Sequence, residues 1–184
     1  SLEALVLTPT RELALQVCSH IRAVVEAGGR FANVAAICGG MSVQKQERVL
    51  LQRGGALIVV ATPGRLWDMI KHDDALALRV RRTRFLVIDE ADRMIEAGHF
   101  AEMDLLLQMV RRTKGAAADA NPDMQTFVYS ATMSKALQTN LKRALWRKKQ
   151  RREAEPSNTL DDLLARVDFR DAEPVVIEMA TQRH

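Results

Sequence analysis

The chain has 184 residues, of which 47% are hydrophobic, which is enough for one sizeable core. It has no apolar run of the ~18 residues that a membrane-spanning helix needs, and no secretory signal is visible, so no membrane partner is expected. The net charge of +4 favours a polyanion such as nucleic acid as partner. Cys18, Cys38 and the four scattered histidines lack metal-ligand spacing, so we expect reduced core cysteines and no structural metal.

Apolar, β-branched runs alternate with amphipathic stretches along the whole chain. In chain order we predict a strand over 2–7, a helix over 11–27, a strand over 34–38, a helix over 43–53, a strand over 57–61, a helix over 64–72, a strand over 85–88, a helix over 91–112, a strand over 126–129, helices over 134–152 and 160–167, and a strand over 175–177. Continuous apolarity with helix-length spacers is typical of parallel strands covered on both faces. We therefore expect an α/β fold with an open, mostly parallel sheet flanked by helices on both faces and joined by right-handed crossovers.

Three carboxylates, at Asp89, Glu90 and Asp92, follow directly after the predicted strand 85–88. Like charges this close repel one another, so the cluster calls for a counter-charge, and a divalent cation with a nucleotide phosphate is the candidate. Magnesium keeps several waters and prefers carboxylate oxygen, so Asp89 is expected to hold it through water while Glu90 deprotonates the attacking water. The alternative is an acidic first turn of a helix, which the helix dipole also favours.

Further candidate residues lie where other predicted strands end, and ligands bind at that edge of an open α/β sheet. Backbone amides at a helix N-terminus attract phosphate, arginine adds charge, and glycine lets a nucleic-acid backbone approach closely. The candidates are Pro9, Thr10, Arg11, Gly39, Gly40, Thr62, Pro63, Gly64 and Arg65. Together they predict a track for successive phosphates that reads backbone rather than base sequence. Each turn alone is also ordinary turn chemistry, and Ser130-Ala131-Thr132 is also explained as a locally capped strand end.

These segments, in this order, resemble the first RecA-like domain of DEAD-box ATP-dependent RNA helicases. The resemblance rests on residues 9–14, 39–40, 62–65, 89–92 and 130–132, and it covers nearly the whole chain. It implies a fold of the P-loop NTPase class, ATP and Mg²⁺ as cofactors, and RNA as a partner bound without sequence preference. Residues 92–102 and the insertion after Trp146 resemble a nucleolar subgroup implicated in maturing the large ribosomal subunit. That finer resemblance implies pre-ribosomal proteins as partners and a nuclear or nucleolar location, with the cytoplasm as the alternative.

The resemblance also assigns roles to residues of the acidic motif, 89–92, and of the hydroxyl motif, 130–132. Asp89 and Glu90 contact the metal and the attacking water, and Asp92 links the nucleotide site to the hydroxyls of Ser130 and Thr132 and to a second domain. The family's main ATP loop, with the pattern G-x-x-x-x-G-K-[ST], occurs nowhere in the sequence. We therefore expect residues 1–184 to be a monomeric, partial N-terminal RecA-like domain. We expect it to be truncated at its N-terminus, to lack the second RecA-like domain and to be inactive alone.

Two other functions remain open on the sequence. One is an RNA-binding scaffold without ATPase activity, which the intact Glu90 and residues 130–132 argue against; the other is a related ATPase that acts on DNA. Two basic clusters lie outside the motifs, namely Arg79, Arg81, Arg82 and Arg84, and Arg147, Lys148, Lys149, Arg151 and Arg152. They are read as solvated faces or as auxiliary docking sites for RNA or protein. The second cluster also resembles a nuclear or nucleolar address.

Overall fold

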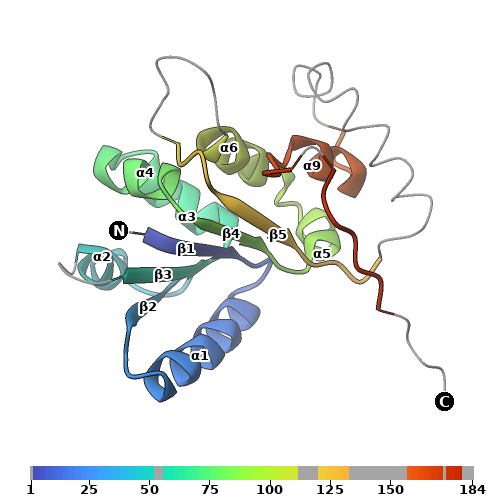
Figure 1. The fold of residues 1–184 in the computed structure, drawn as a ribbon. Helices are drawn as coiled ribbons and strands as arrows, with labels where there is room; N and C mark the ends of the chain where they lie inside the picture. Colours follow the sequence, from blue (N-terminus) through green and yellow to red (C-terminus); the bar gives the residue numbers. More distant parts are fainter. Residues whose placement is uncertain (1, 52–55, 112–119, 133–156, 172, 180–184) are drawn as a thin grey trace.

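The computed structural model describes residues 2–51, 56–111, 120–132, 157–171 and 173–179. Within them a five-stranded parallel sheet has the strand order β2-β3-β1-β4-β5 (Figure 1). The strands are β1 (Leu2–Leu7), β2 (Ala32–Ile37), β3 (Ala56–Ala61), β4 (Phe85–Ile88) and β5 (Gln125–Val128). Leu7 pairs with both Ala61 and Ile88, so the central strands end level with one another. The predicted parallel α/β sheet is confirmed.

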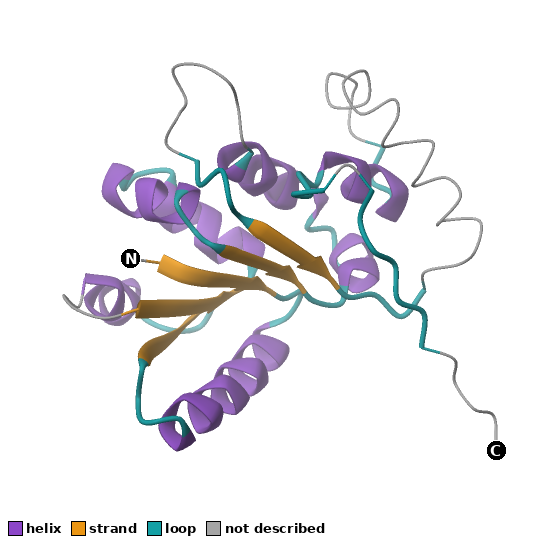
Figure 2. Ribbon diagram, viewed as in Figure 1, coloured by secondary structure: helices purple, strands orange, loops and turns teal. Residues whose placement is uncertain are grey.

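Helices cover both faces of the sheet, as Figure 2 shows. They are α1 (Arg11–Ala27), α2 (Val43–Leu51), α3 (Pro63–Ile70), α4 (Asp74–Arg81), α5 (Ala91–Glu96), α6 (Phe100–Val110) and α9 (Leu160–Arg166). On one face α1 buries Ala14 and Cys18 against strand residues such as Val60. On the other face the remaining helices enclose a larger core around Leu86 and Met103. None of the described helices has the length and apolarity needed to cross a bilayer.

Two predicted elements are wrong in extent or kind, and one helix was not predicted. The predicted helix 91–112 is two helices, because Gly98 adopts φ 77° and turns the chain between α5 and α6. Helix α4 was missed; Asp73 caps it by accepting a hydrogen bond from the Leu76 backbone nitrogen at 3.0 Å. Residues 175–177 are not a strand, since within the described chain they pair with no neighbour and Val175 is 85% exposed. The predicted helix 134–152 lies outside the described residues.

Helix α9 is held on α6 by a buried charged group. The Arg166 guanidinium lies 3.1 Å from Asp104 Oδ1 and 3.3 Å from Asp162 Oδ1, and it also lies over the Phe100 ring. Burial of an arginine is tolerated where carboxylates pair with it in this way. Thr159 caps the start of α9, its side chain accepting a hydrogen bond from the Asp162 nitrogen. The position of α9 is therefore fixed by specific polar contacts as well as by apolar packing.

Candidate functional site

The segments that follow the strands are tied together at the carboxyl edge of the sheet. In each case a backbone N–H just beyond one strand donates to a carbonyl at or near the end of the neighbouring strand. The bonds are Thr62 to Ile37 at 3.0 Å, and Thr8 to Ala61, Asp89 to Leu7 and Tyr129 to Ile88, each at 2.9 Å. Because all four junctions interlock, the sequence-predicted residues lie along one continuous edge rather than at scattered positions.

Asp89 occupies the centre of this edge, directly after β4. Its carboxylate is half-buried, and Oδ1 accepts a hydrogen bond from the Glu90 nitrogen at 2.9 Å. Burial raises the pKa of Asp89, the Glu90 backbone hydrogen bond lowers it, and the Glu90 charge raises it further; the net change is upward. A carboxylate in this environment is stabilised by a nearby cation.

Glu90 adopts a left-handed backbone conformation, φ 49° and ψ 53°, immediately before α5. This conformation is uncommon for a residue with a side chain, and such residues cluster at functional sites, although Arg30 and Asn158 share it in ordinary turns. Its Oε2 lies 3.2 Å from the Arg93 guanidinium. An exposed ion pair of this spacing contributes only about 0.3–0.5 kcal/mol, so it restrains the Glu90 carboxylate weakly.

The hydroxyl motif (residues 130–132) lies beside the acidic motif (residues 89–92). The backbone hydrogen bond from Ala91 N to Tyr129 O, at 2.9 Å, holds the two segments together. Thr132 Oγ1 donates to Asp92 Oδ2 at 3.2 Å, which brings together two residues that are 40 positions apart. Ser130 Oγ is buried and has no hydrogen-bond partner among the described residues. A buried hydroxyl without a partner is unusual in a folded protein.

The donor set at this edge fits a magnesium ion bound together with a nucleotide. Among the described residues no group of three or more histidines, cysteines and acidic residues could form a complete metal cage. Magnesium does not need one, because one or two carboxylates, waters and phosphate oxygens usually complete its octahedron. Asp89, which is half-buried and has a raised pKa, would supply the single carboxylate that such a site requires.

Two of the predicted phosphate-binding turns are in direct contact. Gly40 has φ 77°, and a Cβ at this position would overlap the Arg11 guanidinium. The positive φ favours glycine at position 40, and the absence of a side chain there lets the Arg11 guanidinium lie against the turn. Thr10 caps α1, with its Oγ1 accepting from the Leu13 nitrogen at 3.2 Å, and its side chain is exposed. The two turns thus form one surface rather than two separate sites.

Arg65, in the third predicted turn (residues 62–65), is held in place by Gln46, a residue that the sequence motifs do not include. Its Nη2 donates to the Met41 carbonyl at 2.8 Å and its Nε donates to Gln46 Oε1 at 3.0 Å. Gln46 is only 2% exposed and donates in turn to the Cys38 carbonyl at 2.8 Å. Gln46 and Arg65 therefore fix both ends of the turn that contains Gly39 and Gly40. A direct phosphate contact by Arg65 stays a prediction.

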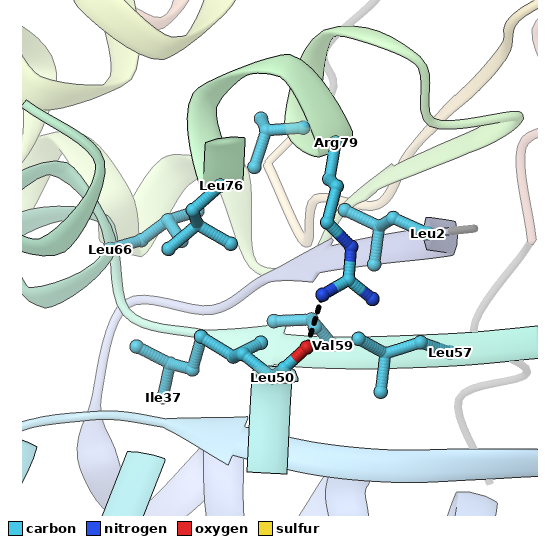
Figure 3. Close-up of a pocket in the computed structure, with 9 residues that line it drawn as sticks. Leu2, Ile37, Leu50, Leu57, Val59, Leu66, Leu76 and Arg79 are labelled. Carbon is cyan, nitrogen blue, oxygen red and sulfur yellow. Dashed lines mark hydrogen bonds between the residues drawn. The ribbon is translucent and has the colours of Figure 1, made fainter. Parts of the chain in front are cut away.

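The first basic cluster lies at the opposite end of β4 from these motifs. Arg84 pairs with Glu3, and Arg79 enters an apolar pocket between α2 and α4, where it donates to the Leu50 carbonyl (Figure 3). Leu2, Leu57 and Val80 also line that pocket, and their packing leaves no free volume for a ligand. This first basic cluster is accordingly not part of the predicted phosphate track. The second cluster, 147–152, lies outside the described residues.

Comparison with known proteins identifies the family. The model for "DEAD/DEAH box helicase" matches residues 1–139. The chain belongs to this helicase family. It is 44% identical over 175 residues to the ATP-dependent RNA helicase DDX24 of Mus musculus, covering 95% of this chain and 19% of that protein. It is 39% identical over 180 residues to the ATP-dependent RNA helicase mak5 of Sclerotinia sclerotiorum, covering 96% and 22%.

Solved structures of DEAD-box helicases share the fold. A DEAD box protein from Methanococcus jannaschii matches with TM-score 0.59 and 31% identity over 77% of this chain and 34% of that one. The helicase Mss116 bound to ssRNA and UDP-BeF matches with TM-score 0.58 and 25% identity over 75% and 27%. The resemblance to the DEAD-box family and the RecA-like fold class are thus confirmed. The chain spans about a fifth of the length of the curated relatives that it matches.

Proposed function

We propose that this helicase-family chain forms the core of the first RecA-like domain of an ATP-dependent RNA helicase. The whole protein would couple ATP hydrolysis to RNA binding and local duplex unwinding. The observation that carries the proposal is the single sheet edge on which Asp89, Glu90 and the Asp92–Thr132 hydrogen bond lie beside the turns that are predicted to bind phosphate. The relatives, which are named ATP-dependent RNA helicases, support it.

Each residue has a distinct part in the proposed reaction. Asp89 would hold Mg²⁺ through bound water, and Mg²⁺ with ATP would supply the phosphoryl group and neutralise its charge. Glu90 takes the proton from the attacking water. Asp92 and Thr132, with Ser130, contact the second domain when it closes on the first. The phosphate-binding loop that grips the nucleotide would come from another part of the whole protein.

RNA binding in this proposal is independent of base sequence. Thr10, Arg11 and the turn of Gly39 and Gly40, here called the glycine turn, offer backbone amides, a hydroxyl and positive charge. These groups bind phosphate oxygens and not bases. Mss116, a protein of the same fold, was solved with ssRNA bound, which supports RNA as the ligand. The resemblance of residues 92–102 to the nucleolar subgroup supports a role in ribosome biogenesis, with pre-ribosomal proteins as partners in the nucleolus.

The test is Glu90→Gln in the full-length protein, with Glu96→Gln, an exposed position on the same helix, as the matched control. Removing a general base slows a reaction by roughly 10² to 10⁴. We expect single-turnover ATP hydrolysis to slow by this factor while ATP and RNA binding are retained, and Glu96→Gln to behave as the parent. Hydrolysis at the parental rate would refute the role of Glu90. A parent stimulated by DNA but not by RNA would indicate a DNA-acting ATPase, and no hydrolysis in the parent would indicate a scaffold.

A further inference from the structure

His99 lies at the junction of α5 and α6, and its backbone is fixed from both sides. Its N–H donates to the Met94 carbonyl at 3.0 Å, which closes α5, and its carbonyl accepts from the Met103 nitrogen at 3.0 Å, which opens α6. The left-handed Gly98 just before it makes this turn possible. Since α5 begins directly after Glu90, the position of His99 follows that of the acidic motif.

The His99 ring reaches from this junction to the first phosphate-binding turn. Nε2 lies 2.9 Å from the Pro9 carbonyl oxygen. A carbonyl only accepts hydrogen bonds, so Nε2 carries the proton and donates. Pro9 directly precedes Thr10, the cap of α1, whose own carbonyl accepts from Ala14 N at 3.0 Å. The orientation of the Pro9–Thr10 peptide is therefore set by His99 on one side and by α1 on the other.

We propose that His99 is a positioning residue for RNA: its hydrogen bond to the Pro9 carbonyl fixes the turn that presents Thr10 and Arg11 to phosphate. This inference rests on the proposed helicase function. Because Arg11 lies against Gly40, a displaced turn would also disturb the glycine turn. A neutral hydrogen bond contributes about 1 kcal/mol net, which corresponds to a loss of about fivefold in RNA affinity.

The experiment compares three variants of the full-length protein. His99→Phe keeps a ring but removes the donor, His99→Gln keeps an N–H donor at similar reach, and His72→Phe alters an exposed histidine away from the motifs. Affinity for single-stranded RNA is measured by fluorescence anisotropy, and ATP hydrolysis is measured with saturating RNA and without RNA. We expect His99→Phe to bind RNA about fivefold more weakly with both hydrolysis rates within about twofold of the parent. His99→Gln and His72→Phe should bind as the parent does.

Three results would overturn the inference. Parental RNA affinity in His99→Phe would show that the hydrogen bond does not position the turn. Equal weakening in His99→Phe and His99→Gln would show that the donor is not the cause. A proportional fall of RNA-free hydrolysis in His99→Phe would show general damage to the domain. The proposed function is judged separately, because a parent that binds RNA without any stimulation of its ATPase refutes helicase coupling while the affinities still decide the role of His99.

Discussion

Replacing Gln46 by Leu isolates the buried network beneath the glycine turn. The substitution keeps the bulk of the side chain but removes the bond to the Cys38 carbonyl at 2.8 Å and the bond from Arg65 Nε at 3.0 Å. Each hydrogen bond contributes about 1 kcal/mol, so the turn loses up to about 2 kcal/mol of restraint. If all of that restraint serves RNA binding, affinity falls by about 30-fold; if half does, it falls by about fivefold.

The assay is a set of fluorescence-anisotropy titrations of the full-length protein on unrelated single-stranded RNAs at several salt concentrations. The matched control is Gln44→Leu, an exposed position on the same helix. We expect Gln46→Leu to weaken every RNA by about 5-fold to 30-fold, because phosphate contacts carry no sequence information. The salt slope should stay at about −0.7 per neutralised phosphate, since no charge is removed.

Two results would refute this reasoning. If Gln46→Leu binds as tightly as Gln44→Leu, the network does not support the RNA surface; if it loses affinity for one sequence only, the surface reads bases. Arg65→Ala in the same titrations separates the two roles of that residue. A slope reduced by about 0.7 shows a direct phosphate contact, whereas weaker binding at an unchanged slope shows that Arg65 acts through Met41 and Gln46.

Two further predictions concern the acidic and hydroxyl motifs. Asp89 has a raised pKa in the folded chain. Its ionisation therefore destabilises the fold when the pH is above that pKa, and it has no such effect when the pH is below the ordinary pKa of 3.8. Without nucleotide or metal, Asp89→Asn should therefore melt at a higher temperature than the parent chain at neutral pH. The gain in melting temperature should vanish at pH below 3.8. An equal or lower melting temperature at neutral pH would contradict this prediction. Replacing Ser130 and Thr132 together by Ala in the full-length protein should impair strand separation more than ATP hydrolysis, and equal losses in paired assays would instead indicate structural damage.

The sheet could be predicted from the sequence because buried parallel strands are continuous apolar runs, and the runs ending at Leu7 and Ile88 have no helical period. The same criterion failed for residues 175–177. An apolar, β-branched run becomes a strand only where a neighbouring strand supplies hydrogen bonds, and no described strand does so there. The division between α5 and α6 was missed because a single glycine is compatible with a helix; only the positive φ of Gly98 shows the turn.

The motifs placed the predicted site residues at one edge, but the sequence did not show which side chains hold them there. Gln46 could have been found, since it lies one helical turn before buried Leu50 and a lone polar residue on a buried helix face requires partners. His99 offered no comparable signal. Its partner is a backbone carbonyl 90 residues away, and only the register between β1 and β4 brings the two together.

The hydrogen bonds at the carboxyl edge of the sheet differ in how easily they can exchange partners, and this difference suggests where the proposed ATP and RNA sites are coupled. Asp89 N donates to Leu7 O at the end of β1, and His99 Nε2 donates to Pro9 O in the turn that follows, each at 2.9 Å. We therefore expect a displacement of residues 89–99 to disturb the turn that is predicted to bind phosphate. By contrast, the bond between Thr132 and Asp92 joins side chains that water can reach, so its partners exchange at little cost. Coupling between the proposed ATP and RNA sites is therefore expected to arise from exchange at Asp92 and Thr132, with the rest of the edge moving as one body.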